Sequence, residues 1–154
     1  MISSLFLSPE KLIEKYPSVQ IYGWNDSRIG LFYSAHLLVG LSNTGGSPLL
    51  IHERSFLSLM SFGKKMAIRK AVYLENPSDV EQDLLTPGEL IEEYPNVIYL
   101  SWNPTKIGVL LSAGLLIGHS HGKGHGSSIT RKSFLMLVDH AHGTLDRRRN
   151  LSSY

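Results

Sequence analysis

Cysteine is absent from the 154 residues of this chain, and long hydrophobic runs are absent with it. The lack of cysteine excludes disulfides, a thiolate nucleophile and cysteine-bound zinc, and it fits a reducing cytoplasm. The longest apolar stretches, Ile29–Leu41 and Ile107–Ile117, are too short and too interrupted to span a bilayer. The segment Met1–Phe6 lacks the basic flank and apolar core of a signal peptide. We therefore expect a cytoplasmic protein without a membrane partner.

Charge and catalytic motifs are also sparse. Charged residues make up 18% of the chain and the net charge is +2, which neither requires nor excludes a nucleic-acid partner. The sequence has no phosphate-binding glycine loop, no nucleophile-elbow pattern and no metalloprotease helix. Hydrophobic residues make up 42%, which is enough for a core. We therefore expect a globular binding protein that is not an enzyme and uses no cofactor.

The strongest feature of the sequence is an internal repeat. At a constant offset of 78 residues (85 − 7), Leu7–Leu59 aligns without a gap with Leu85–Leu137, and about 24 of the 53 aligned positions are identical. The alignment predicts that both copies share one fold and can pack as a pseudo-dimer. The predicted divisions are a first repeat at 1–62, a linker at 63–84, a second repeat at 85–142 and a basic, flexible tail at 143–154.

Each copy carries signals for two successive helices. Ser8 and Thr86 are favourable N-caps followed by proline, and Thr86 opens a capping box with Glu89. A second helix is predicted after the N-caps Asn25 and Asn103. The glycines expected to end the second helices in left-handed C-caps are Gly40 and Gly118.

The rest of each copy predicts a β-hairpin and a third helix. Loops rich in glycine and polar residues, at 42–47 and 120–126, are flanked by short extended stretches, as in a hairpin. Third helices are predicted over Glu53–Phe62 and Arg131–His140. In the linker, Lys64–Leu74 fits a helix, and a strand over Met66–Ile68 is an open alternative. The predicted fold is mainly α with short β-hairpin wings.

The order helix, turn, helix, glycine-rich hairpin, helix resembles the winged helix-turn-helix modules of the MerR and phage-excisionase families. The resemblance includes Gly40 before the hairpin and Ser55-Phe56-Leu57 after it. It implies two tandem winged helix-turn-helix modules in a DNA-binding protein, either a transcriptional regulator or a mobile-element accessory factor. Two modules in one chain would present two reading heads to neighbouring half-sites of double-stranded DNA.

In such a module the start of the second helix faces base edges and the wing follows the DNA backbone. Arg28 and Lys106 occupy the same position in the two copies, where a basic side chain can contact guanine or phosphate. The alternative for both is a solvated charge in a first helical turn. The predicted DNA-binding residues are Ser27, Arg28, Thr105 and Lys106 of the second helices, Asn43, Thr44 and Lys123 of the wings, Lys64 and Lys65 of the linker, and Arg147, Arg148 and Arg149 of the tail.

The remainder of the second helix favours a different partner. Phe32 and Leu38 in the first copy, like Leu110 and Leu116 in the second, belong to segments that are apolar on nearly every face. A helix lying in a major groove needs a polar face. Packing of repeat against repeat, or of chain against chain, explains such a helix. A protein-interaction or scaffold module, or a homo-oligomer, is therefore the alternative function.

Histidines gather in the second hairpin at His119, His121 and His125, and imidazoles can bind Zn²⁺ or Ni²⁺. No carboxylate or cysteine lies among them, and the first copy has other residues at these positions. A fixed metal site also needs supporting hydrogen bonds to its ligands. We therefore expect no metal site.

Overall fold

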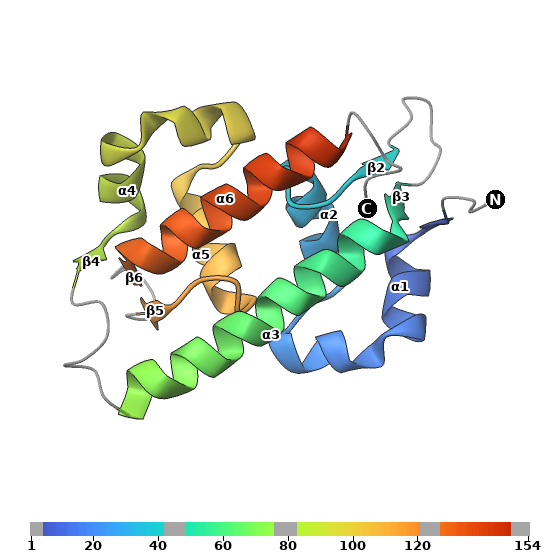
Figure 1. Cartoon of the computed structure of the whole chain (residues 1–154), viewed down its shortest axis with the longest axis horizontal. Helices are drawn as coiled ribbons and strands as arrows, with labels where there is room; N and C mark the ends of the chain where they lie inside the picture. Colours follow the sequence, from blue (N-terminus) through green and yellow to red (C-terminus); the bar gives the residue numbers. More distant parts are fainter. Residues whose placement is uncertain (1–4, 42–48, 76–82, 121–126, 149–154) are drawn as a thin grey trace.

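The computed structural model describes residues 5–41, 49–75, 83–120 and 127–148, and both copies of the repeat show the same succession of elements (Figure 1). The first copy comprises β1 (Phe6–Leu7), α1 (Pro9–Lys15), the 3-10 helix η1 (Pro17–Tyr22), α2 (Asp26–Ser34), β2 (Gly40–Leu41), β3 (Leu50–His52) and α3 (Glu53–Glu75). The second comprises β4 (Leu84–Leu85), α4 (Pro87–Glu93), the 3-10 helix η2 (Pro95–Leu100), α5 (Pro104–Ser112), β5 (Gly118–Ser120), β6 (Ser127–Thr130) and α6 (Arg131–Arg148).

The fold is mainly helical with two small antiparallel sheets, which agrees with the predicted class at this level. In each sheet the two hairpin strands pair as expected, β2 with β3 and β5 with β6. A third strand, β1 or β4, pairs with the other edge of β3 or β6. The sequence analysis missed these third strands, since they are two residues long and lack a strand-like alternation.

The predicted helix starts are confirmed. The side chain of Ser8 accepts a hydrogen bond at the start of α1, and Thr86 and Glu89 form the capping box of α4. Asn25 and Asn103 cap α2 and α5 in the same way. These caps fix where the first turn of each second helix lies, because each satisfies a backbone N–H that has no partner within the helix.

The predicted ends of the second helices are wrong. Each helix stops one turn earlier than expected, because the chain passes through a left-handed residue at His36 (φ 63°) or Gly114 (φ 79°). In the first copy the amide of Leu37 then donates to the carbonyl of Phe32 over 2.9 Å, the hydrogen bond of a Schellman cap. The second copy makes the equivalent bond.

Gly40 and Gly118 serve another purpose than the predicted C-caps. They lie in β2 and β5, where the neighbouring strand passes very close. A Cβ atom on Gly40 would lie 2.7 Å from the carbonyl oxygen of Leu50, and one on Gly118 would lie 2.0 Å from that of Ser128. Glycine is required there by close strand approach.

The third helices are longer than predicted. Helix α3 continues through the predicted linker to Glu75, so Met66–Ile68 is helical and the strand alternative is wrong. Helix α6 continues through Arg148, into the tail expected to be flexible. The added length packs against the other repeat: Tyr73 of α3 is buried, and its hydroxyl makes a 2.8 Å hydrogen bond with Nε2 of His119.

The two repeats pack together through equivalent residues. The indole N–H of Trp24 donates to the carbonyl of Ala113 over 2.8 Å, and that of Trp102 donates to the carbonyl of Ala35 over 2.9 Å. These two bonds exchange under the 78-residue offset. Each repeat therefore uses the same patch to contact the other, as the two subunits of a twofold-symmetric dimer do.

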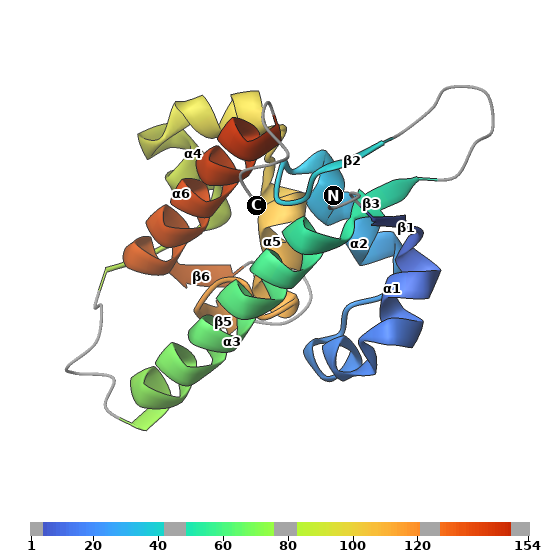
Figure 2. The same ribbon diagram turned by 45° about the vertical axis from the view of Figure 1, so that its right-hand side comes forward.

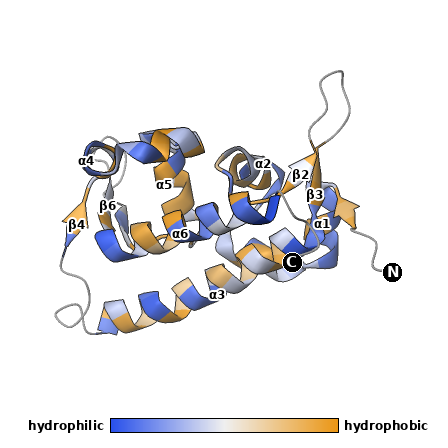
Figure 3. Cartoon of the chain, turned by 45° about the horizontal axis from the view of Figure 1, so that its top comes forward, coloured by the Kyte–Doolittle hydropathy of each residue, from blue (hydrophilic) through white to orange (hydrophobic). Residues whose placement is uncertain are grey.

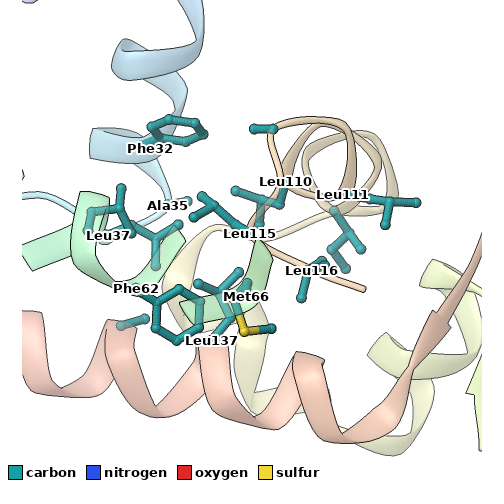
Figure 4. Close-up of a cluster of buried hydrophobic side chains, with 14 of the residues drawn as sticks. Phe32, Ala35, Leu37, Phe62, Met66, Leu110, Leu111, Leu115, Leu116 and Leu137 are labelled. Atoms are coloured by element: carbon teal, nitrogen blue, oxygen red, sulfur yellow. The ribbon is translucent and has the colours of Figure 1, made fainter. Parts of the chain in front are cut away.

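One hydrophobic core joins both repeats. Helices α2 and α5 form one layer, and α3 and α6 cover it as a second layer (Figures 1 and 3). Figure 4 shows Phe32 and Leu37 of the first repeat meeting Leu110 and Leu115 of the second, with Met66 of α3 beneath them. Within the described residues no helix is long and apolar enough to cross a membrane.

Candidate nucleic-acid interface

The first turns of the two second helices differ in what surrounds them. Ser27 and Thr105 are exposed, as a DNA contact requires, whereas Arg28 and Lys106 are only half-exposed. The guanidinium of Arg28 folds back, and its Nη1 donates to the carbonyl of Gly23 over 2.9 Å. Arg28 therefore has a structural role that the sequence did not reveal: it closes the end of η1.

Carboxylates further separate the two helix starts. A cavity of about 450 Å³ beside the first turn of α2 is lined by Glu10 and Asp26 together with Ser27. At the 78-residue offset the second repeat has Gly88 and Pro104 in place of the two carboxylates. Negative charge would repel a DNA phosphate at the start of α2, and neither of these two carboxylates is present at the start of α5.

Four predicted residues from three separate helices lie close enough to two histidines to lower the pKa values of those imidazoles. Burial lowers the pKa of His36, and the positive charges of Arg148 and Lys106 lower it further. Burial likewise lowers the pKa of His140 to about 4, with contributions from Arg147 and Lys65. Lys106 begins α5, Arg147 and Arg148 end α6, and Lys65 lies in α3. We call Lys65, Lys106, Arg147 and Arg148 the basic strip.

The other predicted contacts have different outcomes. Lys64 is exposed on α3, next in sequence to the basic strip. Asn43, Thr44, Lys123 and Arg149 lie outside the described residues, so their predicted roles stay predictions. The strands that flank both wings are placed, since β2–β3 and β5–β6 form antiparallel pairs.

The histidines of the second copy have varied surroundings. His119 contacts Tyr73 of the other repeat, whereas His121 and His125 lie outside the described residues. His140 packs against Phe62 with ring centroids 5.0 Å apart. Within the described part of the chain no group of three or more histidine, aspartate or glutamate side chains is arranged to hold a metal ion.

His36, which lies near Lys106 and Arg148 of the basic strip, was not predicted as a site residue from the sequence. The signal was present in the alignment, since His36 stands where the second repeat has Gly114, directly after a helix. Glycine is the residue that a left-handed backbone prefers. The first repeat nevertheless has a histidine side chain at this position, whereas the second repeat has glycine.

An ion pair near the sheets also differs between the repeats. In the first repeat Glu53 accepts hydrogen bonds from Lys15 and Tyr16, which hold the pKa of its carboxyl below the usual range. At the equivalent positions of the second repeat, Arg131 pairs with Glu93. The charges are exchanged while the contact is kept, so this pair tethers the third helix to the first helix in both copies.

Comparisons with protein-family models, with curated proteins and with solved structures found no match.

Proposed function

We propose that this protein binds double-stranded DNA, as a transcriptional regulator or a mobile-element accessory factor, and that it is not an enzyme. The observation that carries the proposal is the basic strip. Its four positive side chains come from α3, α5 and α6. Lys106 and Arg148 lie close enough to His36, and Lys65 and Arg147 close enough to His140, to lower the pKa of each imidazole. Clustered lysine and arginine side chains are the electrostatic basis of binding to the DNA backbone.

The two winged helix-turn-helix-like repeats contribute unequally in this proposal. Helix α5 presents Thr105 beside Lys106 of the basic strip, whereas α2 presents Ser27 beside two carboxylates. The second repeat therefore acts as the reading head. The first repeat supports it through the shared core and through Lys65 on α3.

The alternative of a protein-interaction module rested on the apolar second helices. Phe32 of α2 and Leu110 of α5 are 0% exposed, and they lie where the repeats meet. The apolar character of these helices is thus explained by packing within one chain. It requires no protein partner.

The proposal is tested by titrating a labelled random-sequence duplex library with the full chain at several salt concentrations. We expect affinity to fall steeply with salt, because each neutralised phosphate contributes about 0.9 to the slope of log K against log salt. The double variant Lys106→Ala/Arg148→Ala should bind more weakly, with a slope smaller by about 2.

Arg28→Ala is the matched control, because Arg28 is the equivalent of Lys106 in the first repeat. It should change the salt slope little, since its guanidinium already bonds to Gly23. Failure of the parent protein to retain any duplex at low salt would overturn the proposal. Equal losses in the Arg28 and Lys106 variants would instead show two equivalent heads.

A further inference from the structure

Side chains of the second repeat approach His36 of the first repeat: the charges of Lys106 and Arg148 are close enough to lower the pKa of its imidazole. The hydrogen bond from the indole of Trp102 to the carbonyl of Ala35 fixes the approach to α5 against the end of α2. His36 follows Ala35 directly, and Lys106 lies in the first turn of α5. The C-terminal end of α6, which carries Arg148, reaches this region beside α2 (Figures 1 and 2).

The pseudo-equivalent place supports this arrangement. Gly114, Gly23 and Lys70 line a single cavity of about 360 Å³. Gly114 and Lys70 are the counterparts of His36 and Arg148 at the 78-residue offset. At that place the end of α5 and the far half of α3 line one cavity, and the internal symmetry predicts the same neighbourhood for the end of α2 and the far half of α6.

His36 has two unusual properties for a residue at a helix end. Its backbone is left-handed, a conformation that glycine adopts freely and that histidine adopts at a cost. Its Nδ1 is buried, and within the described residues this nitrogen has no hydrogen-bond partner. An imidazole with Nδ1 enclosed is best protonated on Nε2, so that Nε2–H can donate to a group arriving from solvent.

We propose that His36, Lys106 and Arg148 form a binding site for one phosphate group. The Nε2–H, the ammonium and the guanidinium supply donors of the kind that phosphate oxygens accept, and the two permanent charges compensate the anion. Among the described residues, neither Lys106 nor Arg148 forms a salt bridge with a carboxylate. Their positive charges are therefore available to a ligand.

The site occurs once, although the fold is repeated. At the pseudo-equivalent place, Gly114 of the second repeat replaces the imidazole, and Arg28 of the first repeat is bonded to the carbonyl of Gly23. This inference deepens the proposed function and rests on it for the source of the phosphate, which is the DNA backbone. A free phosphate ion has the same chemistry, and the experiment distinguishes the two sources.

The test follows the ring nitrogens of His36 by NMR in the full chain. Inorganic phosphate is added against chloride at matched ionic strength, and the duplex library is added in a separate titration. We expect a saturable change at His36 with phosphate. Lys106→Ala should weaken phosphate binding about tenfold or more, as for loss of a charge-assisted hydrogen bond, while Arg28→Ala should bind as the parent does.

His36→Gly supplies a second readout, because it introduces the residue that the other repeat has at this position and should fold. Followed through neighbouring backbone amides, it should weaken phosphate binding, and it should leave the salt slope for duplex nearly unchanged because the imidazole of His36 is neutral. If neither phosphate nor duplex changes the His36 signals, the phosphate site is overturned, even if the duplex is retained elsewhere. If phosphate binds at His36 but no duplex is retained, the site stands as a free-phosphate site and DNA binding is overturned.

Discussion

Replacing His140 with phenylalanine should remove a large part of the acid sensitivity of this protein. His140 lies at the junction of α3 and α6, and its ring packs against Phe62 with centroids 5.0 Å apart. The two residues are equivalents at the 78-residue offset, so His140→Phe places the same side chain on both sides of the junction. The substitution also removes a buried Nε2 that has no partner within the described residues.

The expected magnitude follows from the pKa of this imidazole. Burial, aided by the charges of Arg147 and Lys65, lowers the pKa of His140 from about 6.5 in the unfolded chain to about 4 in the folded protein. Between these two values the unfolded state binds the proton and the folded state does not, so stability falls as the pH falls. At about 1.4 kcal/mol for each unit of pKa difference, the loss reaches about 3 kcal/mol near pH 4.

The assay is urea unfolding followed by the fluorescence of the two buried tryptophans, from about pH 7.5 to pH 4. Near neutral pH, His140→Phe should differ from the parent by less than about 1.5 kcal/mol, as for a nearly size-matched core change. Near pH 4 it should be the more stable by about 3 kcal/mol relative to that starting difference. His142→Gln, an exposed position in the same helix, is the control. Parallel pH profiles for His140→Phe and the parent would refute the reasoning.

Substitutions at three further sites test the contacts and the backbone geometry described above. Trp102→Ala should lower the free energy of unfolding by about 3–5 kcal/mol, because the ring is buried. Trp102→Phe should lower it by about 1–3 kcal/mol, because the carbonyl of Ala35 then loses its hydrogen-bond donor. Glu53→Arg should destabilise the protein, because it places a second positive charge beside Lys15. Adding Lys15→Glu should restore stability, because the ion pair then has the same charges as in the second repeat. No recovery in the double variant would contradict the assigned contact. Ser101→Gly should stabilise by about 1 kcal/mol, because Ser101 has φ 64°, and an unchanged denaturation midpoint would show that this backbone is unstrained.

The repeat and the helix starts were predictable because their signals are local. A side chain at an N-cap bonds to the helix it begins, so Asn25 and Asn103 could be recognised without knowing anything about the rest of the fold. The capping box of Thr86 and Glu89 was recognisable in the same way, since its two residues bond to each other's backbone within one helical turn. Neither inference needed a contact between the repeats.

The helix ends were mispredicted because the true signal is present in one copy only. Gly114 occupies the left-handed position of the Schellman cap, but its counterpart is His36, whereas Gly40 and Gly118 are glycine in both copies. Agreement between copies therefore favoured the wrong pair. The glycines that both copies share are required by strand contact, a long-range property that a helix-ending rule does not include.

The length of α3 and the position of the basic strip depend on contacts between the repeats. Within its own repeat, the far half of α3 has little to cover, and its sequence looks like a charged linker. Its partner is the second repeat, where Tyr73 meets His119. The same crossing places Arg148 of α6 close enough to His36 of the first repeat for its charge to lower the pKa of that imidazole, although the two residues are 112 positions apart in the chain (148 − 36).

Differences between equivalent positions support the proposal that the whole chain, rather than the single repeat, is the functional unit. Each repeat donates the same tryptophan hydrogen bond to the other, so the packing between the repeats is symmetric. Other side chains differ between equivalent positions: Asp26 corresponds to Pro104, and His36 corresponds to Gly114. Two reading heads of equal role would need equal charge at their first turns. Symmetric packing combined with asymmetric charge instead favours the proposal of one reading head, in which residues of the other repeat would complete the phosphate contacts.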